Sequence, residues 1–69
     1  MPRLVLEVPG ISCDHCRRAI EGEVGSVPGV EGVEVDLDRK TVTVAGAVDQ
    51  AAVAAAIEEA GYDVAGRRE

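Results

Sequence analysis

An α+β fold of four short strands and two helices is what this sequence predicts. Apolar residues alternate with polar ones over several short stretches, as in half-buried strands, and recur every three or four residues over two longer ones, as in amphipathic helices. The resulting order is strand, helix, strand, strand, helix, strand. This is the split βαβ pattern of a ferredoxin-like sandwich, with a four-stranded antiparallel sheet and both helices on one of its faces. The 69 residues leave room for a single domain, 1–69.

The first half of the chain begins with an apolar strand, 4–8, which a Pro-Gly pair ends. A helix is expected from 14 to about 24, because its apolar residues share one face at the 3 and 4 spacing. Gly25 is a suitable C-terminal stop for that helix. The next two markers, Pro28 and Gly29, fit the central positions of a type II turn, since proline presets the first φ and glycine tolerates the positive φ that follows.

The second half predicts a hairpin, a helix and a last strand. Valine and leucine alternate with polar residues over 33–37, and valine alternates with threonine over 41–44, on either side of the polar segment 38–40. A second helix is expected over 49–60, since it begins at a capping aspartate and ends before a glycine. Its buried stripe is expected to comprise Val53, Ala56, Ile57 and Ala60. A short last strand is expected at 62–65.

The composition excludes several classes of function. The 13 acidic and 7 basic side chains give a net charge of -6, whereas a nucleic-acid-binding domain normally carries a basic stripe, so we expect no nucleic-acid partner. No segment approaches the roughly 18 apolar residues that cross a bilayer, and no apolar signal-peptide region follows residues 1–3. We therefore expect a cytoplasmic protein without direct membrane insertion, whose cysteines stay reduced.

Both cysteines, Cys13 and Cys16, lie within four positions at the turn between the first strand and the first helix. Two thiols at this spacing can point into one small space, where they bind a soft metal ion or do redox chemistry. Thiolates favour Cu(I), a d10 ion that two ligands satisfy, whereas a structural Zn(II) site needs four and would have to recruit His15 with another ligand, or a second molecule. Because a helix N-terminus stabilises an anion, Cys16 is expected to be the more acidic thiol.

The segment 10–16 resembles the Gly-Met-x-Cys-x-x-Cys signature of the heavy-metal-associated domain family, in particular of its small bacterial copper chaperones, with Ile11 in place of the methionine. The Pro-Gly-Val at 28–30 and the Ala-Gly-Tyr-Asp-Val at 60–64 extend the resemblance over almost the whole chain. The resemblance implies carriage of Cu(I) rather than enzymatic activity. The partner it implies is a copper-transporting P-type ATPase or a copper-responsive regulator. It also implies a monomer without metal that is able to form a copper-bridged homodimer.

The residues around the cysteines are expected to support the site. In zinc-exporting relatives an aspartate commonly precedes the first cysteine, and Ser12 stands there, which favours copper; Ser12 and Asp14 are also candidates to cap the helix. His15 is expected to be exposed, since one helical step turns a side chain about 100 degrees from its neighbour, and to act as a nearby cation at low pH. Tyr62 resembles the tyrosine that shields the metal loop in bacterial members, and Ile11 is expected to anchor the loop in the core.

Other functions stay open on the sequence alone. The chain could be a regulatory metal-binding domain excised from a transporter, or a mercury or zinc carrier of the same fold. It could also be a thiol–disulfide oxidoreductase, because a Cys-x-x-Cys pair that opens a helix is also the thioredoxin arrangement. Against this, the chain is short for that fold and lacks the Trp and Pro commonly found around the redox pair. Arg17 and Arg18 are either a solvated basic pair or a device that orients docking on an acidic partner.

Overall fold

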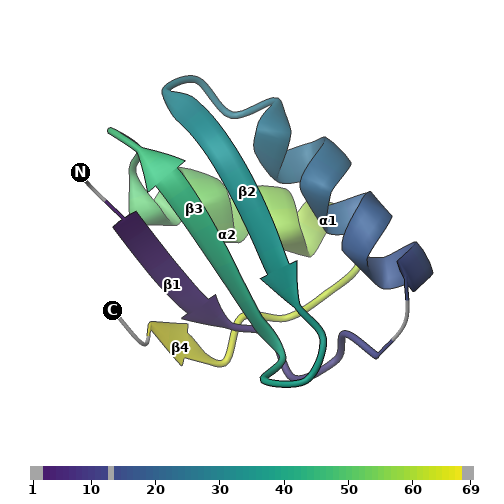
Figure 1. Cartoon of the computed structure of the whole chain (residues 1–69). Helices are drawn as coiled ribbons and strands as arrows, with labels where there is room; N and C mark the ends of the chain where they lie inside the picture. The colour runs from purple at the N-terminus through teal and green to yellow at the C-terminus, as the bar shows by residue number, and fades with distance from the viewer. Residues whose placement is uncertain (1–2, 13, 68–69) are drawn as a thin grey trace.

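The strands and helices form a two-layer sandwich in the computed structural model, which describes residues 3–12 and 14–67 (Figure 1). In chain order the elements are β1 (Arg3–Glu7), α1 (Asp14–Gly25), β2 (Val30–Asp36), β3 (Thr41–Gly46), α2 (Gln50–Glu59) and β4 (Gly66–Arg67). The strands lie in the order β2-β3-β1-β4, and each neighbouring pair is antiparallel. Both helices cover the same face of the sheet. The predicted ferredoxin-like fold is therefore confirmed.

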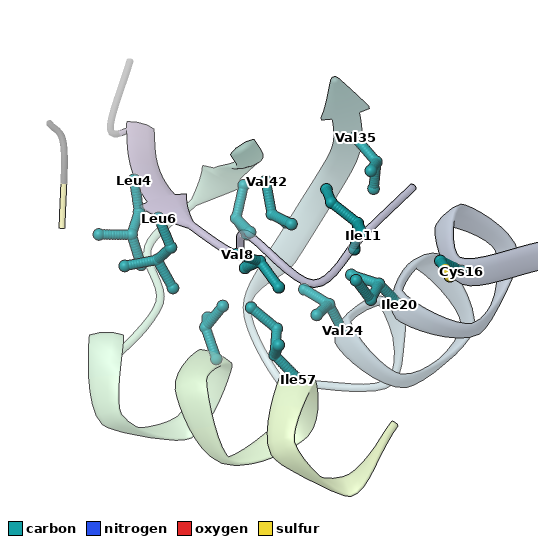
Figure 2. Packing of buried hydrophobic residues seen from close by; sticks show 12 residues of the cluster. Leu4, Leu6, Val8, Ile11, Cys16, Ile20, Val24, Val35, Val42 and Ile57 are labelled. Carbon is teal, nitrogen blue, oxygen red and sulfur yellow. The ribbon is translucent and has the colours of Figure 1, made fainter. Parts of the chain in front are cut away.

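The strand alternation directs apolar side chains to the helix-facing side of the sheet. In the central β1–β3 ladder, Leu4 pairs with Val44 and Leu6 pairs with Val42, and all four are buried. The helices contribute the residues that recur at the 3 and 4 spacing, which are Cys16, Ile20, Val24, Val53 and Ile57 (Figure 2). The core is thus built almost entirely of aliphatic side chains, because the sequence contains no Trp or Phe and a single Tyr.

The helix boundaries follow local capping signals. Asp49 is the N-cap of α2, and its side chain accepts a hydrogen bond from the Ala51 backbone N at 3.1 Å. Beyond the other end of α2, Gly61 has φ +96° and its N–H donates to the Glu58 carbonyl at 2.9 Å, as in a Schellman motif. Both signals agree with the prediction. Within residues 3–12 and 14–67, no helix has the length and apolarity to cross a membrane.

The last strand lies later in the chain than predicted. The sequence places it at 62–65, whereas β4 comprises residues 66–67 and pairs with β1 there. The reason is the end of α2, where the Tyr62 N–H donates to the Ile57 carbonyl at 3.2 Å and completes the helix cap. Tyr62 and Val64 are half-buried because they pack on the core, and this packing produces a strand-like alternation without strand pairing.

The backbones at the start of β2 and the end of β3 approach each other closely at two glycines, Gly29 and Gly46. The Val30 N–H donates to the Val27 carbonyl at 3.2 Å, and Gly29 has φ +92°, so the predicted type II turn is confirmed. Gly46 has φ +122° and is buried against this turn. A β-carbon at Gly46 would collide with the carbonyl oxygen of Gly29. The close approach of the two backbones therefore requires glycine.

Candidate metal centre

The loop between β1 and α1 lies at one end of the sandwich, beside the β2–β3 turn and the segment that follows α2 (Figure 1). Ile11 fixes this loop to the core, since its side chain is 0% exposed and packs among the buried residues. The Ile11 N–H donates to the Val8 carbonyl at 3.2 Å, which tightens the chain between β1 and α1. The prediction that Ile11 serves as an apolar anchor is confirmed.

Cys16 lies in the first turn of α1, on the side of the helix that faces the core. It is 9% exposed and precedes Ile20 and Val24 along the same buried stripe (Figure 2). A helix N-terminus presents amide groups and the positive end of the dipole, which favour a thiolate. Cys13 lies outside the described residues, so its place beside Cys16 and the order in which the two thiols titrate stay predictions.

Three exposed side chains lie around this point: Ser12, Asp14 and His15. The predicted exposure of His15 is confirmed, while its influence on the thiols stays a prediction. Asp14 is the first residue of α1, and its Oδ1 accepts a hydrogen bond from Arg17 Nε at 3.3 Å. The position that precedes it, where a cap residue would stand, is residue 13 and lies outside the described residues. The capping and supporting roles of Ser12 also stay predictions.

Tyr62 lies against the loop between β1 and α1, beside Gly10. Its ring is half-buried, and a β-carbon built on Gly10 would lie 3.7 Å from Tyr62 Cδ1. The helix cap at the end of α2 holds the Tyr62 backbone in place. The structure thus brings together two segments that are about 50 positions apart, as the predicted topology requires. Shielding of a metal by this ring stays a prediction.

Lys40 is a neighbour of the loop that the sequence does not predict. Its Nζ donates to the Ile11 carbonyl at 2.9 Å, in a partly buried contact, and its own carbonyl accepts from the Val8 N–H at 2.8 Å. A lysine in a polar turn is ordinarily solvated. The signal that points to it is topological, because the β2–β3 turn and the end of β1 must lie at the same end of this sheet.

The described residues contain no group of three or more His, Cys, Asp or Glu side chains that could hold a metal ion. A tetrahedral zinc site needs four ligands. Residues 3–12 and 14–67 by themselves therefore do not assemble such a site.

A ferredoxin-like sandwich whose sequence carries a Cys-x-x-Cys pair where the first helix begins is typical of small metal-binding domains. Residues 5–63 match the family described as the heavy-metal-associated domain, and the chain belongs to this family. The copper chaperone CopZ of Bacillus subtilis (strain 168) is 44% identical over 68 residues, which cover 94% of this chain and 99% of that protein.

Solved structures show the same likeness. A structure of a CopZ metallochaperone superposes with a TM-score of 0.87 at 35% identity, and the match covers 91% of this chain and 98% of that one. A copper-binding domain from HMA7, a P-type ATPase, superposes with a TM-score of 0.86 at 23% identity over 100% of both chains, which shows a shared fold. The same fold thus serves a chaperone and a domain of a P-type ATPase.

Proposed function

We propose that this chain is a cytoplasmic copper(I) chaperone in which Cys13 and Cys16 hold the ion. The observation that carries the proposal is the near full-length likeness to copper chaperones, combined with the position of Cys16 in the first turn of α1. Thiolates are soft donors that suit Cu(I), and two of them satisfy this ion. The ion is cargo, so the protein changes no substrate chemically.

The low coordination number of Cu(I) allows the protein both to bind the ion and to release it to a partner. An ion with two thiolate ligands leaves space for a thiolate of the partner, so one copper–sulfur bond can form before another breaks. The ion passes through three-coordinate shared intermediates, and its oxidation state does not change. This exchange needs an accessible rim, and the exposed Ser12 and His15 lie on such a rim beside the buried Cys16.

The acceptor we propose is a metal-binding domain of a copper-exporting P-type ATPase, with a copper-responsive regulator as the other candidate. The shared fold of the HMA7 domain supports the ATPase, because donor and acceptor can present matching loops. Arg17 is engaged on its own helix, with Asp14 Oδ1 at 3.3 Å and Glu21 Oε2 at 3.7 Å. Arg18 is exposed and is therefore the better candidate to steer docking, with an effect on association rate more than on affinity.

Copper transfer between isolated proteins tests this function. The chain is loaded anaerobically with one equivalent of Cu(I), mixed with the metal-free amino-terminal domain of a copper-exporting ATPase, and separated rapidly by ion exchange. We expect copper to redistribute within seconds, without capture by a chelator of intermediate affinity present in the mixture. Preference for Zn(II) over Cu(I), or reduction of insulin disulfides with no copper binding, would contradict the proposal and support a zinc carrier or an oxidoreductase.

His15 provides a separate prediction about the site. Because its side chain is exposed, His15→Ala is expected to leave the copper stoichiometry at one per chain and to change the affinity by less than about tenfold at pH 7. Competition against a colorimetric Cu(I) chelator between pH 6 and pH 8 measures both quantities. Complete loss of binding in His15→Ala would show that the imidazole is a ligand.

A further inference from the structure

We propose that Lys40 is a positioning residue of the copper loop, which clamps the chain from Val8 to Ile11 and holds a positive charge against the loop. This inference rests on the proposed function. Three hydrogen bonds close a ring among these residues: Val8 N to Lys40 O at 2.8 Å, Ile11 N to Val8 O at 3.2 Å, and Lys40 Nζ to Ile11 O at 2.9 Å. The turn before the cysteine pair is therefore held from the hairpin at both of its ends.

The contact from Lys40 Nζ is the stronger part of the clamp. A hydrogen bond with an ionised donor is stronger than a neutral one, and partial burial reduces competition from water. The contact also joins residues that are 29 positions apart, so it ties the metal loop to a different part of the fold. Ile11 holds the loop by its buried side chain and Lys40 holds it by the backbone carbonyl, which leaves the loop two independent anchors.

The backbone of the hairpin turn is shaped for this contact. Lys40 has φ +56°, a left-handed conformation that is unfavourable for a residue with a β-carbon and persists where the surroundings determine it. The residues before it are held by Asp36, whose Oδ1 accepts from the N–H groups of Asp38 and Arg39, each at 3.0 Å. Lys40 thus projects its ammonium from a turn that is already fixed. Glycine would adopt this φ more easily, and its absence here is consistent with a use for the side chain.

Charge gives the clamp a second role once copper is bound. Two thiolates and one Cu(I) carry a net charge of one negative unit, in a chain whose net charge is already -6. The ammonium contacts the Ile11 carbonyl, and Ile11 precedes Cys13 by two positions in the sequence. A positive charge held against the loop favours the binding of a complex with a net negative charge.

The test compares Lys40→Met with Arg39→Met. Lys40→Met keeps the aliphatic stem and the left-handed backbone but removes the ammonium, while Arg39→Met removes an equal charge from the exposed neighbouring position. We expect Lys40→Met to weaken Cu(I) binding about tenfold in chelator competition, which corresponds to one charge-assisted hydrogen bond. Hydrogen exchange of the loop amides in the metal-free protein is expected to become several-fold faster. Arg39→Met is expected to match the wild type in both measurements.

The variant Lys40→Gly distinguishes an effect on the position of the loop from an effect on the stability of the fold. Glycine relieves the left-handed strain, so its denaturation midpoint is expected to lie above that of Lys40→Met, while its copper affinity stays equally reduced. The proposal is overturned if Lys40→Met equals the wild type in affinity or in loop exchange, if Arg39→Met weakens binding as much, or if Lys40→Gly restores affinity. Should the wild type itself not bind Cu(I), the proposed function fails, and the exchange data on metal-free protein still decide whether the clamp exists.

Discussion

The double substitution Cys13→Ser with Cys16→Ser is expected to abolish Cu(I) binding and leave a folded chain. Serine hydroxyls are hard donors that stay protonated at neutral pH, so they do not replace thiolates as ligands of a soft ion. The measurement is anaerobic competition against a weak colorimetric Cu(I) probe, with the thiols of the wild type shown to be reduced beforehand. Copper retained by the variant, or ignored by the reduced wild type, would contradict the assignment of the two ligands.

Stability needs its own control in this experiment, because Cys16 is a core residue. Burying a serine hydroxyl in place of the thiol costs up to about 1–3 kcal/mol. Cys16→Ala removes the thiol without burying a hydroxyl and therefore serves as the matched variant. Both variants should lose copper, and circular dichroism with urea denaturation shows how much of the folded population remains. Loss of copper in a folded Cys16→Ala chain assigns the effect to the ligand rather than to the core.

The parts of the fold that the sequence predicts correctly are those with local causes. Asp49 caps α2 through the nearby Ala51, and Gly61 terminates the same helix by its own positive φ. The alternation in β1 and β3 likewise fixes which side chains face the helices, because a strand has a period of two. Each of these signals involves residues a few positions apart. These signals can therefore be recognised in the sequence without knowledge of the rest of the chain.

The wrong placement of β4 has a cause that is not local. Tyr62 and Val64 carry the alternation of a strand, yet the Tyr62 N–H is committed to the helix cap. The chain pairs with β1 only after crossing to the sheet edge, and Gly66 then lies opposite Glu7. The length of that crossing depends on the distance between the end of α2 and the edge of the sheet. A pattern of apolar residues does not encode this distance.

The candidate metal site likewise has features that the sequence predicts and one that it does not. The cysteine pair and the anchor Ile11 follow from the motif and its resemblance to a family, and the proximity of Tyr62 to Gly10 follows from the topology. The contact of Lys40 with Ile11 depends on a side-chain direction and on one left-handed residue in a turn. Neither has a recognisable pattern in the sequence, since a lysine among polar residues is typical of a solvated turn.

Gly46→Ala is expected to destabilise the fold by about 2–4 kcal/mol. Its φ of +122° is outside the range that side chains accept, and the new methyl group would collide with the Gly29 carbonyl and lie 3.0 Å from the Glu31 N. These are backbone atoms, so relief requires the end of β3 to separate from the start of β2. A chain of this size rarely has more than about 3–5 kcal/mol of stability. Much of the Gly46→Ala population should therefore be unfolded at 37 °C, and urea denaturation measures the loss.

Gly22→Ala is the matched control, because it makes the same chemical change with the opposite expected sign. Gly22 lies inside α1, and a β-carbon there would meet nothing within 4 Å. Alanine is expected to stabilise the helix by about 0.5–1 kcal/mol through lower chain entropy in the unfolded state. A Gly46→Ala midpoint within error of the wild type would show that the two strands can separate at little cost. Equal losses in both variants would mean that added methyl groups, rather than the Gly29–Gly46 contact, cause the effect.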